Sequence, residues 1–266
     1  MPQRLDLYNS AYGNYEMDIY RQVRVETYGQ DFGQTSWLTT EESAEIPQIL
    51  DLKSKSSVLE LGCGSGGYAL HLAEKLECSL VGLDINASGV RNANQLALQR
   101  GLAARARFEQ CDVSKGLPFA DQTFDAAFSN DVLCHIPGRP KVLGEIFRVL
   151  KPGGRMLFSD ALVLGGIVSN EEIATRSSIG FYLYTPPGEN ERLIDRAGFR
   201  GVRVTDTTEA AARIAKRWHD AREQRKEELV AAEGIVNFEG LQRFLSCVHA
   251  LTSEGRLRRY LYFGSK

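Results

Sequence analysis

The sequence is poor in cysteine, in excess charge of either sign and in long apolar runs. Its five cysteines are scattered and form no Cys-x-x-Cys pair, which argues against a disulfide framework and against a bound metal. A formal charge of −2 argues against nucleic acid as the main partner, because phosphate binding needs a clear basic surface. No apolar stretch approaches the ~20 residues that cross a bilayer, and the first residues lack the apolar core of a signal peptide. These absences predict a cytoplasmic protein with reduced thiols and no membrane span.

What is present is an ordinary globular composition, with 43% hydrophobic and 25% charged residues. In the middle of the chain, short apolar runs alternate with segments that have helical spacing. The predicted strands are Ser57–Leu61, Ser79–Leu83, Arg105–Gln110, Phe124–Ser129 and Arg155–Ser159. The predicted helices between them are Tyr68–Leu76, Ala87–Arg100 and Pro140–Leu150. This alternation predicts an α/β fold with a parallel, doubly wound sheet.

The later part of the chain follows another pattern. A short helix over Glu189–Ala197 precedes a strand over Phe199–Thr205, and a last strand is expected over Arg258–Phe263. Between these strands, Thr208–Ala232 reads as one long amphipathic helix. Two late strands separated by a helical insertion predict an antiparallel pair at one edge of the sheet.

A glycine-rich loop, Glu60–Gly67, directly follows the first predicted strand. Glycines let the backbone turn tightly and approach a ligand, and the next helix begins with unpaired amides. The loop fits the GxGxxG pattern of dinucleotide enzymes and also the pattern ExGxGxG. A glycine-rich turn without any ligand is the structural alternative. We expect a nucleotide-like ligand here.

Acidic residues follow the next two strands, at the same predicted edge of the sheet. Asp84 can accept hydrogen bonds from ribose hydroxyls; its alternative role, capping the following helix, suits Asn86 better. Asp112 can accept from an adenine amine, with the amide of Val113 donating to the ring, or it can form an Asx-type turn. Both positions are compatible with a bound adenosine.

Four segments together carry a family resemblance: ELGCGSGG, VGLDIN, CDVSKGLPFADQTFDAAFSND and VLKPGGRMLFSD. In this order and spacing, over Ser56–Asp160, the chain resembles class I S-adenosylmethionine-dependent methyltransferases. The flanking segments YGQDFGQTSWL, SNDVLCHI and GRLRRYLYF resemble the group of sarcosine/dimethylglycine and phosphoethanolamine N-methyltransferases. The resemblance favours the ExGxGxG interpretation of the glycine loop.

The resemblance implies a Rossmann-like, doubly wound, seven-stranded sheet with its last strand antiparallel, a helical substrate cover and S-adenosyl-L-methionine as the cofactor. Asp84 would hold the ribose, Asp112 and Val113 the adenine, and Asn130 would lie beside the methionine amino group. The full set expected at the cofactor is Glu60, Gly62, Cys63, Gly64, Asp84, Ile85, Asp112, Val113 and Asn130.

The catalytic candidates follow from the chemistry of methyl transfer, which needs a base only when the acceptor arrives protonated. His135 titrates near neutrality and lies shortly after Asn130, so it is the candidate base, although it could merely buttress the loop before Pro137. In the resembling phosphoethanolamine enzymes this histidine pairs with an N-terminal tyrosine, for which Tyr15 and Tyr20 are the candidates here.

Three aromatic residues are candidates for substrate binding. Trp37 could form a wall of the methyl site or belong to the core. Tyr182 and Tyr184 lie between the fifth strand and the next helix, where a lid would fall, but they too could be core residues. Neither pattern nor spacing separates these roles.

We therefore expect one domain over residues 1–266, acting on a small molecule. Its core would be 41–161, 188–206 and 257–264, and its substrate cover 1–40, 162–187 and 207–256. The expected reaction is methylation of an amine nitrogen. The alternatives are an O- or C-methyltransferase of a hydrophobic natural product and, in another class, a nicotinamide-dependent oxidoreductase. A homodimer is compatible with the sequence.

Overall fold

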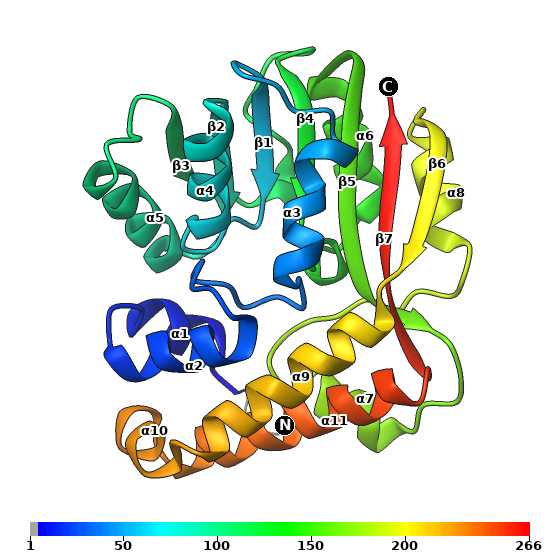
Figure 1. Ribbon diagram of the computed structural model, residues 1–266. Helices are drawn as coiled ribbons and strands as arrows, with labels where there is room; N and C mark the ends of the chain where they lie inside the picture. The colour runs from blue at the N-terminus through cyan, green and yellow to red at the C-terminus, as the bar shows by residue number, and fades with distance from the viewer. Residues whose placement is uncertain (1–4) are drawn as a thin grey trace.

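A mixed sheet forms the centre of the computed structural model, which describes residues 5–266 (Figure 1). Its strand order within the described residues is β3-β2-β1-β4-β5-β7-β6. The strands are β1 (Ser57–Leu61), β2 (Ser79–Asp84), β3 (Ala106–Gln110), β4 (Phe124–Ser129), β5 (Leu150–Leu164), β6 (Arg200–Asp206) and β7 (Leu257–Ser265). Strand β7 runs antiparallel to both of its neighbours, β5 and β6. The predicted Rossmann-like sheet with its last strand antiparallel is therefore confirmed.

Helices cover both faces of the sheet, as a parallel sheet requires. One face packs against α3 (Thr40–Ile49), α4 (Gly67–Leu76) and α5 (Ala87–Gln99) through a core that includes Ile46 and Leu70. The other face packs against α6 (Arg139–Val149) and α8 (Glu189–Arg196). The chain crosses from β1 to β2 on one side and later to β4 on the other, so the crevice for a ligand opens at the carboxyl end of β1.

The remaining helices form a layer below the sheet in Figure 1, beyond the carboxyl ends of the parallel strands. They are α1 (Tyr8–Gly13), α2 (Asp18–Tyr28), α7 (Asn170–Arg176), α9 (Thr208–Glu223), α10 (Lys226–Glu233) and α11 (Ile235–Ser253). These helices share a core of their own that includes Tyr28, Trp37, Trp218 and Phe244. Segments from three distant parts of the sequence thus lie together over the edge where a ligand is expected.

The structure differs from the sequence-based expectation in the insertion before β7. The single helix expected over Thr208–Ala232 is wrong, because the chain turns at Gln224 and Arg225 between α9 and α10. A buried ion pair between Arg222 and Glu233 closes this turn. The longest helix of the insertion, α11, lies beyond the predicted segment. Every helix within residues 5–266 is too short or too polar to cross a membrane.

Candidate active site

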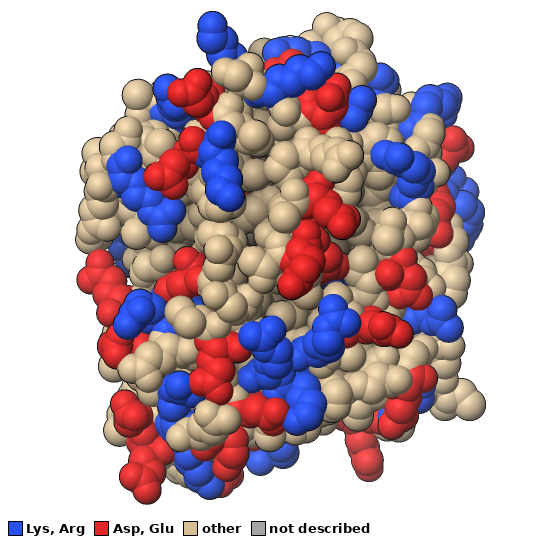
Figure 2. Space-filling model, viewed as in Figure 1, with Lys and Arg blue, Asp and Glu red and all other residues tan. Residues whose placement is uncertain are grey.

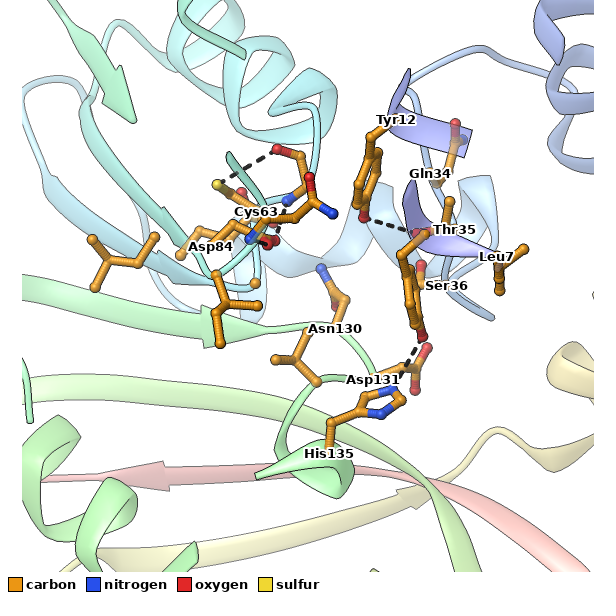
Figure 3. Close-up of a pocket in the computed structure, with 18 of the residues that line it drawn as sticks. Leu7, Tyr12, Gln34, Thr35, Ser36, Cys63, Asp84, Asn130, Asp131 and His135 are labelled. Atoms are coloured by element: carbon orange, nitrogen blue, oxygen red, sulfur yellow. Dashed lines mark hydrogen bonds between the residues drawn. The ribbon is translucent and has the colours of Figure 1, made fainter. Parts of the chain in front are cut away.

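A cavity of about 880 Å³ opens between the carboxyl ends of the strands and the helical layer. Loops after β1, β2, β3 and β4 form one side, and α1 with the segment before α3 forms the other. Figure 3 shows Cys63 and Asp84 on one side of this cavity and Tyr12 and Thr35 facing them. Asn130 is drawn between Asp84 and His135. The volume lies at the upper end of the range for small-molecule sites, which gives room for two ligands.

The glycine loop after β1 is packed so closely that side chains would not fit. Gly62 and Gly64 both have positive φ values, +75° and +52°. A Cβ atom on Gly62 would meet Cγ2 of Val132 at 2.1 Å, and one on Gly64 would meet the hydroxyl of Tyr12 at 2.7 Å. The glycines therefore allow both the turn and the close approach of the elements that surround the cavity.

Asp84 fixes the glycine loop against the end of β2. Its Oδ2 accepts from the amide of Gly64 and its Oδ1 from the amide of Asn86, both at 2.8 Å. Burial raises the pKa of this carboxyl group, while these backbone hydrogen bonds act in the opposite direction. Asn86 caps α5 by accepting from the amides of Ser88 and Gly89, as expected. Each oxygen of Asp84 keeps a second lone pair, with which it can accept from a ligand hydroxyl.

Glu60 is a buried carboxyl group on the cavity wall, only 4% exposed. Its Oε2 atom has no hydrogen-bond partner among the described residues. Burial, with a smaller contribution from Asp84, raises the pKa of Glu60 to about 8. A buried acceptor without a partner is costly in a folded chain, so this position suits a cationic or hydrogen-bonding group of a ligand.

The residues after β3 form the far end of the cavity. Asp112 accepts from the amide of Ser114 at 3.1 Å and from its hydroxyl at 2.6 Å. It therefore forms an Asx-type turn, the structural alternative to adenine binding. Asp112 nevertheless lines the cavity together with Val113 and with Ile85, which is largely exposed. An exposed apolar side chain at a cavity mouth offers a face against which a flat ring can pack.

His135 lies in the cavity wall, in the loop after β4, and is paired with Tyr8. The hydroxyl of Tyr8 lies 3.1 Å from Nε2 of His135, and Nδ1 lies 3.0 Å from the carbonyl oxygen of Phe181. A carbonyl oxygen only accepts, so Nδ1 donates to it, and in the neutral ring Nε2 accepts from the hydroxyl of Tyr8. Burial raises the pKa of Tyr8, which keeps its hydroxyl protonated as the donor. The pair is thus ordered as a donor and an acceptor beside the cavity.

The N-terminal tyrosine that hydrogen-bonds His135 is therefore Tyr8, and the expected pairing with Tyr15 or Tyr20 is wrong. The ring of Tyr15 lies under the guanidinium group of Arg24, 4.5 Å away. The hydroxyl of Tyr20 donates to Glu233 at 3.0 Å. The placement of the N-terminal helices determines which tyrosine reaches His135, because α1 faces the cavity whereas α2 packs against α9. The residue pattern offered several tyrosines and no signal to choose among them.

Of the three aromatic candidates for substrate binding, Trp37 is buried in the core, and Tyr182 and Tyr184 are partly buried against it. Trp37 packs against Trp218 and Phe244, with ring centroids 5.9 and 6.2 Å away, and does not line the cavity. Tyr184 hydrogen-bonds Ser177 at 3.0 Å. Tyr182 lies behind the site, with its ring centroid 4.2 Å from that of His135. Its neighbours Ile179 and Phe181 line the cavity instead.

A buried charge network that local sequence patterns do not reveal fixes the loop after β4. Asp131 adopts a positive φ of 57° and accepts from the amide of Trp37 at 2.9 Å and the hydroxyl of Ser159 at 2.8 Å. The fully buried Arg259 of β7 donates from Nε to Asp131 at 2.9 Å and from Nη1 to Glu42 at 2.7 Å. The network therefore joins the sheet, α3 and the start of the loop that carries His135.

The family model described as "Methyltransferase domain" matches residues 52–178. Phosphoethanolamine N-methyltransferase 3 of Arabidopsis thaliana is 32% identical over 84% of this chain and 44% of its own length. A wheat phosphoethanolamine N-methyltransferase is 29% identical over 90% of this chain and 46% of its own length. The chain thus spans about half the length of these relatives. Phosphoethanolamine N-methyltransferase 2 of Haemonchus contortus, a solved structure with S-adenosylhomocysteine, has a TM-score of 0.81 and 22% identity, over 97% of this chain and 60% of that one.

Residues 52–178 of this chain thus form a methyltransferase domain, and the fold is that of the class I S-adenosylmethionine-dependent methyltransferases. Methyltransferases of this fold use S-adenosyl-L-methionine as their cofactor. The residues of the cavity fit this group: the loop of Gly62 and Gly64 gives it close backbone approach, and Glu60 has an unpartnered oxygen atom for a charged amino group. The matched domain includes the glycine loop and favours its methyltransferase pattern over the dinucleotide pattern.

Proposed function

We propose that this chain methylates the nitrogen of a small-molecule amine. The observation that carries the proposal is the pair of Tyr8 and His135, which lies in the wall of the cofactor cavity. An aliphatic amine is protonated at neutral pH and has no free lone pair until it loses a proton. A hydroxyl group that donates to a neutral imidazole ring is suited to receive that proton.

The hydrogen bonds of the pair define a path for the proton. The oxygen of Tyr8 accepts the proton of the acceptor ammonium while its own proton passes to Nε2 of His135. The carbonyl oxygen of Phe181 accepts from Nδ1 and stabilises the imidazolium ring that results. The relay consumes no second base, and proton release to water restores it after each turnover.

The other residues of the site position the two ligands. S-adenosylmethionine, when bound, supplies a methyl group on an activated, positively charged sulfur. Asp84, Glu60 and Asn130 all line the cavity; Asp84 would accept from ribose hydroxyls, and Glu60 and Asn130 would hold the methionine amino group. Aligning the nucleophile with the methyl group can contribute roughly 7–11 kcal/mol, so positioning is the main contribution of the protein.

The proposal is tested by incubating the chain with methyl-labelled S-adenosylmethionine and a panel of amines, phenols and isoprenoids, with products identified by mass spectrometry. We expect labelled product from amines. Labelled product from phenols or isoprenoids alone would overturn the amine assignment and favour O- or C-methylation. The replacements Tyr8→Phe and His135→Ala show whether the pair takes part.

Other expectations stay predictions, namely the cytoplasmic location, the division into core and cover, a homodimer and the lack of a nucleic-acid partner. Figure 2 shows basic and acidic side chains interspersed over one face of the molecule. Such a mixed surface supports a small acceptor, because phosphate backbones bind to surfaces with a concentration of positive charge.

A further inference from the structure

Apart from His135, the ionisable Asp, Glu, Lys and Arg side chains that line the cavity among the described residues are all acidic, and Glu60 stays protonated up to about pH 8. They are Asp6, Glu60, Asp84, Asp112 and Asp131. Two of them have cationic partners, Lys115 for Asp112 at 3.4 Å and Arg259 for Asp131 at 2.9 Å, but neither cation lines the cavity. The interior is therefore acidic, and it favours positively charged or neutral ligands over anions.

Next to the catalytic pair, the cavity wall is apolar. His135 is followed by Ile136 and hydrogen-bonds the backbone of Phe181, and Leu7 precedes Tyr8. A hydrogen bond of 3.0 Å from the amide of Leu5 to the carbonyl of Ser178 brings the N-terminal segment to the segment that carries these groups. The apolar side chains that line the cavity here are Leu5, Leu7, Ile136, Ile179 and Phe181.

We infer that the acceptor is an unphosphorylated amine with an apolar body, an inference that rests on the proposed function. The ammonium group would lie at Tyr8 in the acidic cavity, and the body of the molecule against the apolar wall. No arginine or lysine of the described residues lines the cavity, and the buried Arg176 lies behind the ring of Tyr182, 4.5 Å from its centroid. A buried phosphate dianion would therefore have no cationic partner on the cavity wall, which is costly. The chain thus departs from the substrate for which its plant relatives are named.

Two comparisons test this inference. The first measures kcat/KM for n-alkylamines from propylamine to octylamine, with methyl-labelled cofactor. Each methylene buried against the wall should raise kcat/KM about fourfold, until the tail leaves the cavity. The second compares ethanolamine with phosphoethanolamine, and we expect ethanolamine to be the better acceptor by at least about tenfold. Calorimetric titration of the same amines in the presence of S-adenosylhomocysteine gives a binding readout that does not depend on turnover.

A matched pair of variants connects the effect to the wall. Phe181→Ala removes a side chain that is 52% exposed and leaves intact the backbone carbonyl that holds His135. It should flatten the dependence of kcat/KM and of affinity on chain length. Val236→Ala, at a similarly exposed position of α11 outside the cavity, should leave that dependence unchanged.

The outcomes separate the inference from the function on which it rests. Better turnover or tighter binding of phosphoethanolamine than of ethanolamine would overturn the inference and leave amine methylation standing. Affinity that does not change along the alkylamine series would also overturn it. The proposed function would be overturned if no amine were methylated while phenols or isoprenoids gave product. The titrations would still test the inference, because they measure how amine affinity depends on chain length and on a phosphate group.

Discussion

The hydroxyl of Tyr8 lies 3.1 Å from Nε2 of His135, although 127 positions separate the two residues in the chain. The segment before Tyr8 is held by both later parts of the helical layer. Leu5 donates to the carbonyl of Ser178, and the amide of Asp6 donates to the side chain of Asn237 at 2.9 Å. Completion of the site therefore depends on three distant segments folding together over the edge of the sheet.

Tyr8→Phe should lower kcat by roughly 10²–10⁴-fold, the range for loss of acid–base catalysis. The affinity for S-adenosylhomocysteine should stay near that of the unmodified protein, because the glycine loop and Asp84 are untouched. Steady-state kinetics with the best amine of the panel, together with titration calorimetry, measures both quantities.

His135→Ala should lower kcat to a similar extent, and the double variant should be no worse than either single one, since residues that act as a unit are not additive. Tyr15→Phe is the control, because the ring of Tyr15 packs against Arg24 and away from His135. A loss in Tyr15→Phe as large as in Tyr8→Phe would contradict the assignment of the pair.

Glu60→Gln should change how the stability of the cofactor-free protein depends on pH. The pKa of Glu60 is raised from 4.5 to about 8 in the folded state, chiefly by burial. Between these values the folded state retains a proton that the unfolded state has released, so stability falls as pH rises from 4.5 to 8. The variant lacks this loss, so at pH 8 its free energy of unfolding should exceed that of the unmodified protein by up to a few kcal/mol.

Denaturant unfolding of both forms at pH 5 and at pH 8 measures the effect of Glu60→Gln. The same variant should bind the cofactor more weakly, because a neutral amide forms no ion pair with the charged amino group of S-adenosylmethionine. Parallel loss of stability with pH in the two forms would show that another group is responsible.

Gly62→Ala should destabilise the protein more than Gly138→Ala does. Both glycines have similar positive φ values, +75° and +78°, so both replacements carry a backbone cost of roughly 1–2 kcal/mol. Only at Gly62 would the new Cβ meet another side chain, that of Val132 at 2.1 Å, whereas nothing lies within 4 Å at Gly138. Urea midpoints compare the two, and Val132→Ala should restore part of the loss in the first. Equal losses would contradict the packing argument.

Arg259→Met should lower the free energy of unfolding by roughly 3–5 kcal/mol, because it leaves the buried carboxylate of Asp131 without its cation. Arg200→Met, which removes a pair with Asp195 in which both side chains are more than two-thirds exposed, should cost about 0–1 kcal/mol. Thermal unfolding of the two variants gives the comparison. Equal stability of the two variants would show that the network does not hold the loop after β4.

The core of the fold was predictable because local patterns agreed with the tertiary arrangement. Strands β1 and β4 lie where the apolar runs predict them, and Asn86 caps α5 as its side chain suggests. Each strand is buried and flanked by polar turn residues, so the signal is contained within a few neighbouring positions. The end of each strand then places Glu60, Asp84 and Asn130 at one edge without further information.

The helical layer was far less predictable. Its helices pack against one another through residues that lie far apart in the sequence, such as Tyr28 with Trp218, whose ring centroids are 6.2 Å apart. Aromatic residues in such segments can face a ligand or a core, and the pattern is the same in both cases. For that reason the pattern predicts Trp37, Tyr182 and Tyr184 as substrate-binding residues, although none of them lines the cavity.

The sequence by itself determined the sheet, the cofactor loop and the family, because each depends on contiguous motifs whose chemistry is local. The tertiary structure alone decided which tyrosine hydrogen-bonds His135 and which acidic side chains line the cavity. Both features depend on how α1 is positioned over the sheet edge. Contacts of the segment before α1 with residues such as Ser178 and Asn237 fix that position. No spacing within the N-terminal segment encodes contacts made so far along the chain.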